Sequence, residues 1–151
     1  MLRLPKKMLF ALEAVVDIAY NGRAAPVQSK EITRRQGIPQ RYLEQVMQQL
    51  VRAGILKGVR GPRGGYHLAR ERRRISVGEI IRVINELDQA NSNLAYDSSS
   101  DLGNKVVKPM LEELNDDVML KLDDITLQDL CQRASAYGVT SESEKHLDFT
   151  I

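Results

Sequence analysis

Along the first half of the chain, apolar residues recur every three or four positions, which is the spacing of one helix face. The pattern predicts three helices, at residues 6–20, 29–36 and 39–53. Ser29 is a suitable N-terminal cap for the second helix, and Gly37 follows it where helices often end in a left-handed residue. Pro39 opens the third helix, where its missing N–H costs nothing, and Gly54 ends it.

The third predicted helix separates apolar from polar side chains. One stripe is apolar and consists of Leu43, Val46, Met47 and Leu50. The opposite side is polar and carries Arg41, Gln45, Gln48 and Arg52, with Glu44 beside them. Such a helix packs its apolar stripe on a core and leaves its polar side for solvent or a partner.

After Gly54 the pattern changes from helical spacing to alternation. Residues 55–60 and 66–70 are predicted as two strands, and residues 61–65 between them are rich in Gly and Pro, which is typical of a tight turn. Together they predict a β-hairpin with a basic tip.

The second half begins with a helix start. Ser76 and Glu79 have the spacing of a capping box, so we expect a fourth helix to run to about residue 87. The polar residues 88–104 are predicted as a loop.

Two more helices are predicted beyond that loop. A long one runs to about residue 122 with Pro109 in its first turn, and a short one runs from Thr126 to about residue 133. The residues from Ser135 onward lack periodicity, so we expect a mobile tail.

Composition narrows the class of protein. Of 151 residues, 42% are hydrophobic and 28% are charged, which is the balance of an ordinary soluble globular chain. No apolar run approaches the roughly 20 residues of a membrane span, and we recognise no signal peptide, so we expect a cytoplasmic protein without membrane contact. The single cysteine, Cys131, excludes an intramolecular disulfide framework and fits a reducing compartment.

The small net charge of +2 conceals a strong asymmetry. Residues 1–75 contain 16 Lys and Arg against 5 Asp and Glu, a net charge of +11, whereas residues 76–151 carry −9. A basic half indicates a polyanionic partner, although a charged surface alone is more often merely solvated. A motif is needed to decide between the two.

The order helix, helix, turn, helix and hairpin supplies that motif, because it is the order of a winged helix-turn-helix. We therefore expect a mainly α fold with a β-hairpin wing (α+β) and a long C-terminal dimerisation helix. The third helix of this fold enters the major groove of DNA, where Arg suits guanine, Gln suits adenine and Glu suits cytosine. The predicted base-reading residues are Gln40, Arg41, Tyr42, Glu44 and Gln45.

The hairpin and nearby basic residues extend the predicted DNA contacts. Arg63 at the tip suits the minor groove, where negative potential is focused. The wing candidates are Arg60, Gly61, Pro62, Arg63, Gly64 and Gly65, whose glycines let the backbone approach phosphates closely. The phosphate candidates are Lys6, Lys7, Arg34, Arg35 and Arg60.

The long helix carries an apolar stripe of Val107, Met110, Leu111, Leu114 and Val118, and an acidic side of Glu112, Glu113, Asp116 and Asp117. The stripe can pack within its own domain or pair with a second copy. Pairing explains an acidic half, since that half then faces away from phosphates. The predicted divisions are residues 1–87 for DNA binding, 88–104 as a loop, 105–134 for dimerisation and 135–151 as the tail.

Residues 37–45 and 59–68, which include Gly-Pro-Arg-Gly-Gly-Tyr in the turn and returning strand, resemble the Rrf-two family of bacterial regulators, the IscR, NsrR and CymR type. Residues 75–81 and 124–127 also match the family's pattern, so the resemblance covers about residues 1–133. It implies a homodimer that binds a partly palindromic operator, commonly as a repressor. It also implies base contacts by Tyr42 and Glu44, and a minor-groove contact by the wing.

One departure from the family concerns iron. Many members hold an iron–sulfur cluster on three cysteines in the loop before the dimerisation helix, but residues 88–104 contain no cysteine. The family's non-cysteine ligand falls on Lys108, and an ammonium cannot ligate iron. Neither His67 nor His146 is placed to help, so we expect no cluster. Some cluster-free relatives respond through a partner enzyme such as cysteine synthase, and a partner enzyme or a small-molecule effector stays open here.

Other classes of function remain to be weighed. The chain has no phosphate loop, no zinc-binding spacing and no plausible nucleophile triad, so we expect no enzyme. A protein-interaction module and an unselective DNA binder are the alternatives to a sequence-specific regulator. Cys131 is either a buried structural residue or a redox switch, and reactivity requires an accessible, electropositive setting.

Overall fold

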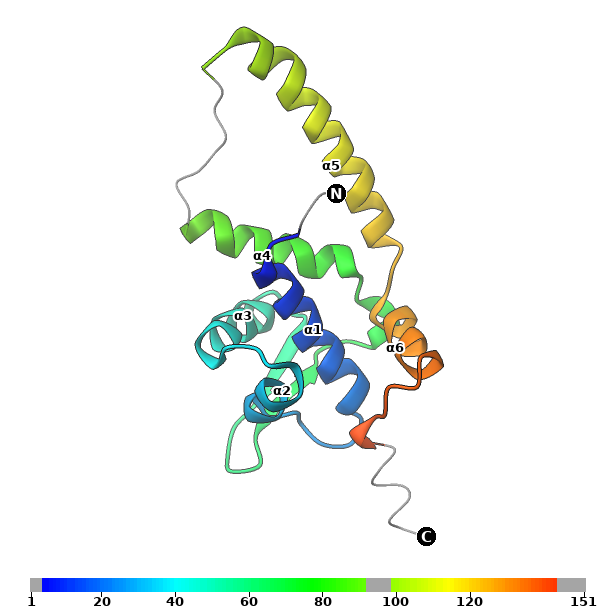
Figure 1. Cartoon of the computed structure of the whole chain (residues 1–151). Coiled ribbons are helices and arrows are strands. Elements are labelled where there is room, and N and C mark those ends of the chain that lie inside the picture. The colour runs from blue at the N-terminus through cyan, green and yellow to red at the C-terminus, as the bar shows by residue number, and fades with distance from the viewer. Residues whose placement is uncertain (1–3, 92–98, 144–151) are drawn as a thin grey trace.

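The computed structural model describes residues 4–91 and 99–143. It is mainly helical with one two-stranded antiparallel hairpin, which confirms the predicted fold (Figure 1). The elements are α1 (Lys6–Asn21), α2 (Ser29–Gln36), α3 (Gln40–Arg52), β1 (Leu56–Val59), β2 (Gly65–Leu68), the 3₁₀ turn η1 (Arg72–Arg74), α4 (Val77–Asn91), the π turn η2 (Gly103–Val107), α5 (Lys108–Asp123) and α6 (Leu127–Ala136). Among the described helices, none has both the length and the apolar character to cross a membrane.

Helices α2 and α3 pack against α1. All three helices contribute buried residues to the core, including Ala14 of α1, Ile32 of α2 and Leu50 of α3. The predicted stripe of α3 is confirmed, because all four of its members, Leu43, Val46, Met47 and Leu50, are buried. The opposite side of α3 is thereby turned to solvent.

Local signals at the ends of α2 are partly as predicted. Gly37 ends the helix in the left-handed conformation, with φ of 67°. Ser29, however, is the first helical residue and not the cap. The preceding Gln28 is the cap, and its backbone N–H donates to the Glu31 carboxylate at 2.9 Å. The hydrogen bond to the Glu31 carboxylate therefore fixes Gln28 as the cap of α2.

The wing is a short antiparallel pair that pairs Leu56 with Leu68 and ends with Val59 opposite Gly65. Each strand has four residues, so the predicted strands were too long. Residue 27 adds a further rung, because Val27 and Tyr66 exchange backbone hydrogen bonds of 3.0 and 2.8 Å. The hairpin is thus held to the segment that leads into α2.

The predicted loop at residues 88–104 is wrong at both ends. Helix α4 continues to Asn91, and the chain is helical again from residue 101 through the π turn η2 into α5. The Ser100 hydroxyl accepts a hydrogen bond from the Gly103 N–H at 3.0 Å, which stabilises this early start. The polar residues at both ends of the predicted loop are therefore helical. The middle of that loop, residues 92–98, lies outside the described residues.

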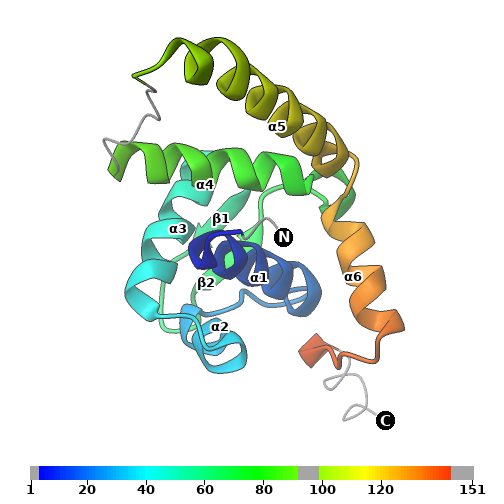
Figure 2. The same ribbon diagram turned by 45° about the horizontal axis from the view of Figure 1, so that its top comes forward.

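Helix α5 extends from the body like an arm (Figures 1 and 2). Its C-terminal end is joined to α4 by Arg82, whose guanidinium donates to both carboxylate oxygens of Asp123 at 2.6 and 2.7 Å. Gly78 lies so close to that carboxylate that a Cβ there would fall 1.9 Å from an Asp123 oxygen. Pro109 lies in the first turn of α5, as predicted.

The end of the described chain differs from the predicted mobile tail. Helix α6 begins at the Thr126–Asp129 capping box and continues to Ala136, and the next residues fold back against the end of α1. The Tyr20 hydroxyl donates to the Val139 carbonyl, and the Ser141 hydroxyl donates to the Tyr20 carbonyl at 2.9 Å. Contacts with distant residues therefore place residues 137–143, whereas residues 144–151 lie outside the described residues.

Candidate nucleic-acid interface

The first two turns of α3 present a polar face to solvent. Gln40, Arg41, Glu44 and Gln45, four of the five predicted base-reading residues, are exposed. The Gln40 amide donates to the Glu44 carboxylate at 3.3 Å, one turn further along. The face therefore offers hydrogen-bond donors and acceptors together, as the readout of base edges requires.

Tyr42, the fifth predicted base-reading residue, has a different environment. It is half-buried, and its hydroxyl donates to the Lys7 carbonyl in the first turn of α1 at 2.6 Å. Burial raises the pKa of Tyr42 to about 12, with a further contribution from the negative charge of Asp88 on α4. The hydroxyl that a base contact would use is thus bound to the protein itself.

Arg60 and Arg63 of the wing are both exposed, and Arg63 lies in the turn where the sequence predicted it. The glycines around them are required by the protein's own backbone. Gly61 has φ of 111°, and a Cβ on Gly65 would lie 2.4 Å from the Val27 carbonyl oxygen. Gly64 is equally confined, since its Cβ would lie 2.3 Å from the carbonyl oxygen of residue 59.

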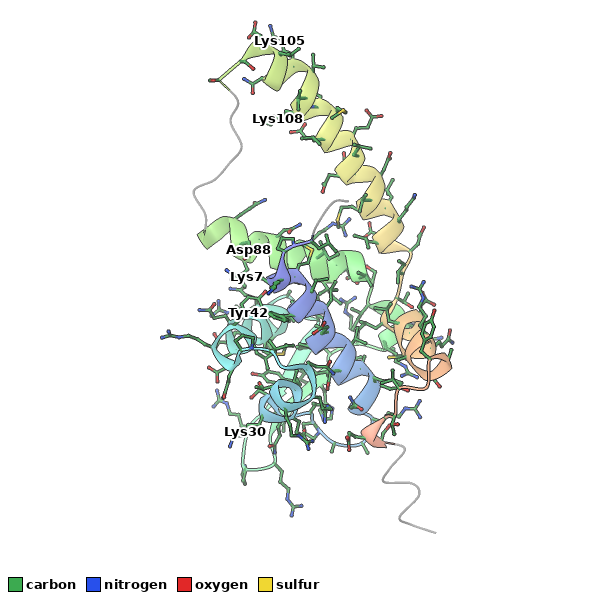
Figure 3. All side chains as sticks on the ribbon, viewed as in Figure 1. Lys7, Lys30, Tyr42, Asp88, Lys105 and Lys108 are labelled. Carbon is green, nitrogen blue, oxygen red and sulfur yellow. The ribbon has the colours of Figure 1, made fainter. Side chains whose placement is uncertain are left out.

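A groove of about 660 Å³ separates the wing from the start of α2. Its lining includes Ser29 and Lys30 on one side and Arg60 and Gly61 on the other (Lys30 in Figure 3). Neither Ser29 nor Lys30 is among the residues that the sequence predicted as phosphate contacts. The signal that could have indicated them is a helix start next to a lysine, because helix N-termini favour anions.

Among the predicted phosphate contacts, Lys6, Lys7 and Arg34 are exposed, but Arg35 is not available. The Arg35 guanidinium donates to the two carboxylate oxygens of Asp17 at 2.8 and 2.7 Å. The Asp17 side chain is 0% exposed and that of Arg35 is 16% exposed. Hydrogen bonding to Asp17 raises the pKa of Arg35 further. The Arg35 guanidinium is therefore held by the buried Asp17 carboxylate, which corrects its prediction as a phosphate contact.

Elsewhere the described residues offer little reactive chemistry. They contain no group of three or more His, Cys, Asp or Glu side chains placed to hold a metal ion. Cys131 is buried on α6, and burial raises the pKa of its thiol, although Arg72 acts in the opposite direction. This environment is that of a structural cysteine and lacks the accessibility that a redox switch requires.

A polar recognition helix beside a basic two-stranded wing defines the class of winged helix-turn-helix DNA-binding proteins. A sequence model of the Rrf2 family, described as an iron-dependent transcriptional regulator, matches residues 4–133. The chain is 32% identical to the HTH-type transcriptional regulator IscR of Escherichia coli over 145 residues, which are 96% of this chain and 90% of that protein.

Solved structures agree with this match. The chain is similar to T. potens IscR, with a TM-score of 0.71, 37% identity and 93% of each chain covered. It is also similar to CymR (YrzC), the global cysteine regulator of B. subtilis, with a TM-score of 0.64, 29% identity, and 88% and 98% covered. The chain belongs to the Rrf2 family, and it is a DNA-binding transcriptional regulator and not an enzyme, as the sequence predicted.

Proposed function

We propose that the protein is a homodimeric repressor that reads a partly palindromic operator with α3 and its wing. The observation that carries the proposal is that both the polar face of α3 and Arg63 of the wing are exposed. Both lie within the first 75 residues, whose net charge is +11. A basic surface attracts phosphates without regard to sequence, and side chains on a groove-sized helix add base preference.

The arm formed by α5 supports the dimer. The members of its predicted apolar stripe, Val107, Met110, Leu111, Leu114 and Val118, are between 36% and 53% exposed. Large apolar side chains gathered on one exposed helix are typical of a surface that another protein covers. A second copy of α5 is the partner that the proposal assigns, because two-fold pairing also places two recognition helices on one DNA duplex.

We further propose that the regulator works without an iron–sulfur cluster, although the family description names iron. The chain has a single cysteine, Cys131, which is buried on α6. The residues at the start of the arm include Lys105 and Lys108, both exposed ammonium groups that cannot ligate iron. The donor set does not fit a cluster, so the proposal assigns the signal to a partner enzyme or a small-molecule effector.

The test is selection of sites from random duplex DNA, followed by titration of the selected site by fluorescence anisotropy across a salt series. We expect a two-fold symmetric site with half-sites about 10 bp apart or a multiple of that. Arg41→Ala, Glu44→Ala and Arg63→Ala should each weaken binding by about 1–3 kcal/mol. Arg133→Ala, which removes an exposed arginine on α6, is the matched control and should change little.

The outcomes separate the alternatives. Binding without enrichment of any site indicates an unselective DNA binder. Absence of DNA binding, or full affinity in all three variants, indicates that α3 and the wing serve a protein partner. Repression is tested separately by placing the selected site across a promoter that drives a reporter gene.

A further inference from the structure

Tyr42 joins the recognition helix to the first two turns of α1 through three contacts. Its hydroxyl donates to the Lys7 carbonyl at 2.6 Å. Its ring packs on Phe10, with ring centroids 6.4 Å apart and planes inclined at 58°. The Lys7 ammonium lies over the same ring, 5.9 Å from its centroid. Figure 3 shows Lys7, Tyr42 and Asp88 close together in the view, on α1, α3 and α4 respectively.

These contacts hold two parts of the DNA surface in one geometry. Tyr42 lies in the first turn of α3, next to the exposed Arg41 and two residues from the exposed Glu44. Lys7 lies in the first turn of α1, and its side chain is exposed. A helix that is held at its first turn keeps its base-reading side chains at a set distance and angle from the ammonium of Lys7.

We propose that Tyr42 is a positioning residue for operator binding and not a base-reading residue. It sets the orientation of the base-reading face of α3 relative to Lys7, and this role rests on the proposed DNA-binding function. Without the hydroxyl, α3 samples orientations that do not fit the major groove of DNA. The apparent affinity for DNA then falls in proportion to the fraction of molecules whose α3 has the fitting orientation.

The first variant is Tyr42→Phe, which keeps the ring and removes only the hydroxyl. We expect it to weaken binding to the selected site by about 3- to 10-fold, the effect of losing one neutral hydrogen bond. The loss should be equal for the selected site and for its single-base variants, because no base contact is removed. Tyr20→Phe is the matched control, since it also removes a hydroxyl that donates to a backbone carbonyl, at the opposite end of α1.

Two further measurements separate positioning from direct contact and from general destabilisation. Amide hydrogen exchange of residues 40–45 in the DNA-free protein should be faster in Tyr42→Phe and unchanged in Tyr20→Phe. Phe10→Leu, which alters the packing partner of the ring, should also weaken DNA binding, and its effect should not add to that of Tyr42→Phe.

Several results would overturn the inference. Relaxed preference at a single base pair in Tyr42→Phe would assign Tyr42 to base reading. An equal loss of affinity in Tyr20→Phe would reduce the effect to stability, and full affinity in Tyr42→Phe would remove the role altogether. If the parent protein binds no DNA, the proposed function fails, and the inference fails with it.

Discussion

The strongest quantitative prediction concerns the ion pair between the partly buried Arg35 and the buried Asp17. Replacing Arg35 by Met removes both hydrogen bonds from its guanidinium to the Asp17 carboxylate and leaves the one donated by Gln36 at 2.8 Å. A hydrogen bond to a charged group contributes about 1.5–3 kcal/mol, and breaking a buried pair by removing one partner costs about 3–5 kcal/mol. We therefore expect Arg35→Met to lose about 3–5 kcal/mol of unfolding free energy.

Urea denaturation followed by circular dichroism at a constant protomer concentration measures this loss, because dimerisation would otherwise shift the apparent stability. Arg34→Met is the matched control. Its guanidinium is exposed, so its stability should stay within about 0.5 kcal/mol of the parent. The double variant Asp17→Asn, Arg35→Met should recover part of the loss, since no unpaired charge then remains buried.

The same two substitutions should also differ in their effects on DNA binding. Arg34→Met should weaken binding and reduce its salt dependence, as expected for a phosphate contact. Arg35→Met should leave the salt dependence unchanged in the folded protein. If Arg35→Met is as stable as the parent while the salt dependence of its DNA binding falls, Arg35 faces phosphates and not Asp17.

Three further predictions test other parts of the structure. Gly65→Ala should lose about 1–3 kcal/mol of unfolding free energy in thermal or urea denaturation, because its Cβ would meet the Val27 carbonyl. Gly58→Ala is the control and should be tolerated, because its Cβ would meet nothing within 4 Å. Burial disfavours the charged form of Glu79, but hydrogen bonds from Ser76 and Arg70 outweigh it and lower the pKa of Glu79. The ionised Glu79 therefore stabilises the fold above the ordinary carboxyl pKa, and this stabilisation is lost as the pH falls through the lowered pKa. Glu79→Gln should accordingly be less stable than the parent at pH 7 and equally stable in acid. A stability difference that stays constant across pH contradicts this. Leu114→Glu on the exposed stripe should yield a monomer in analytical ultracentrifugation, and an unchanged dimer would place the interface elsewhere.

Much of the fold was predictable from the sequence because its signals are local. Helix starts at the Ser76–Glu79 and Thr126–Asp129 pairs depend on groups three residues apart, and the structure contains both capping boxes. The left-handed end of α2 at Gly37 and the buried stripe of α3 were equally predictable. Each of these features depends on residues within about one or two turns of each other, so periodicity and spacing are sufficient to identify them.

The contacts that tie these elements together were decided only by the tertiary structure. Arg34 and Arg35 are neighbours of one chemical type, yet only Arg35 meets Asp17, which lies 18 residues earlier in the chain. The Tyr42 hydroxyl meets a carbonyl 35 residues away, and the segment around Val139 meets Tyr20 across 119 residues. Local spacing cannot specify such partners, because they are brought together by the packing of helices whose relative placement depends on the whole core.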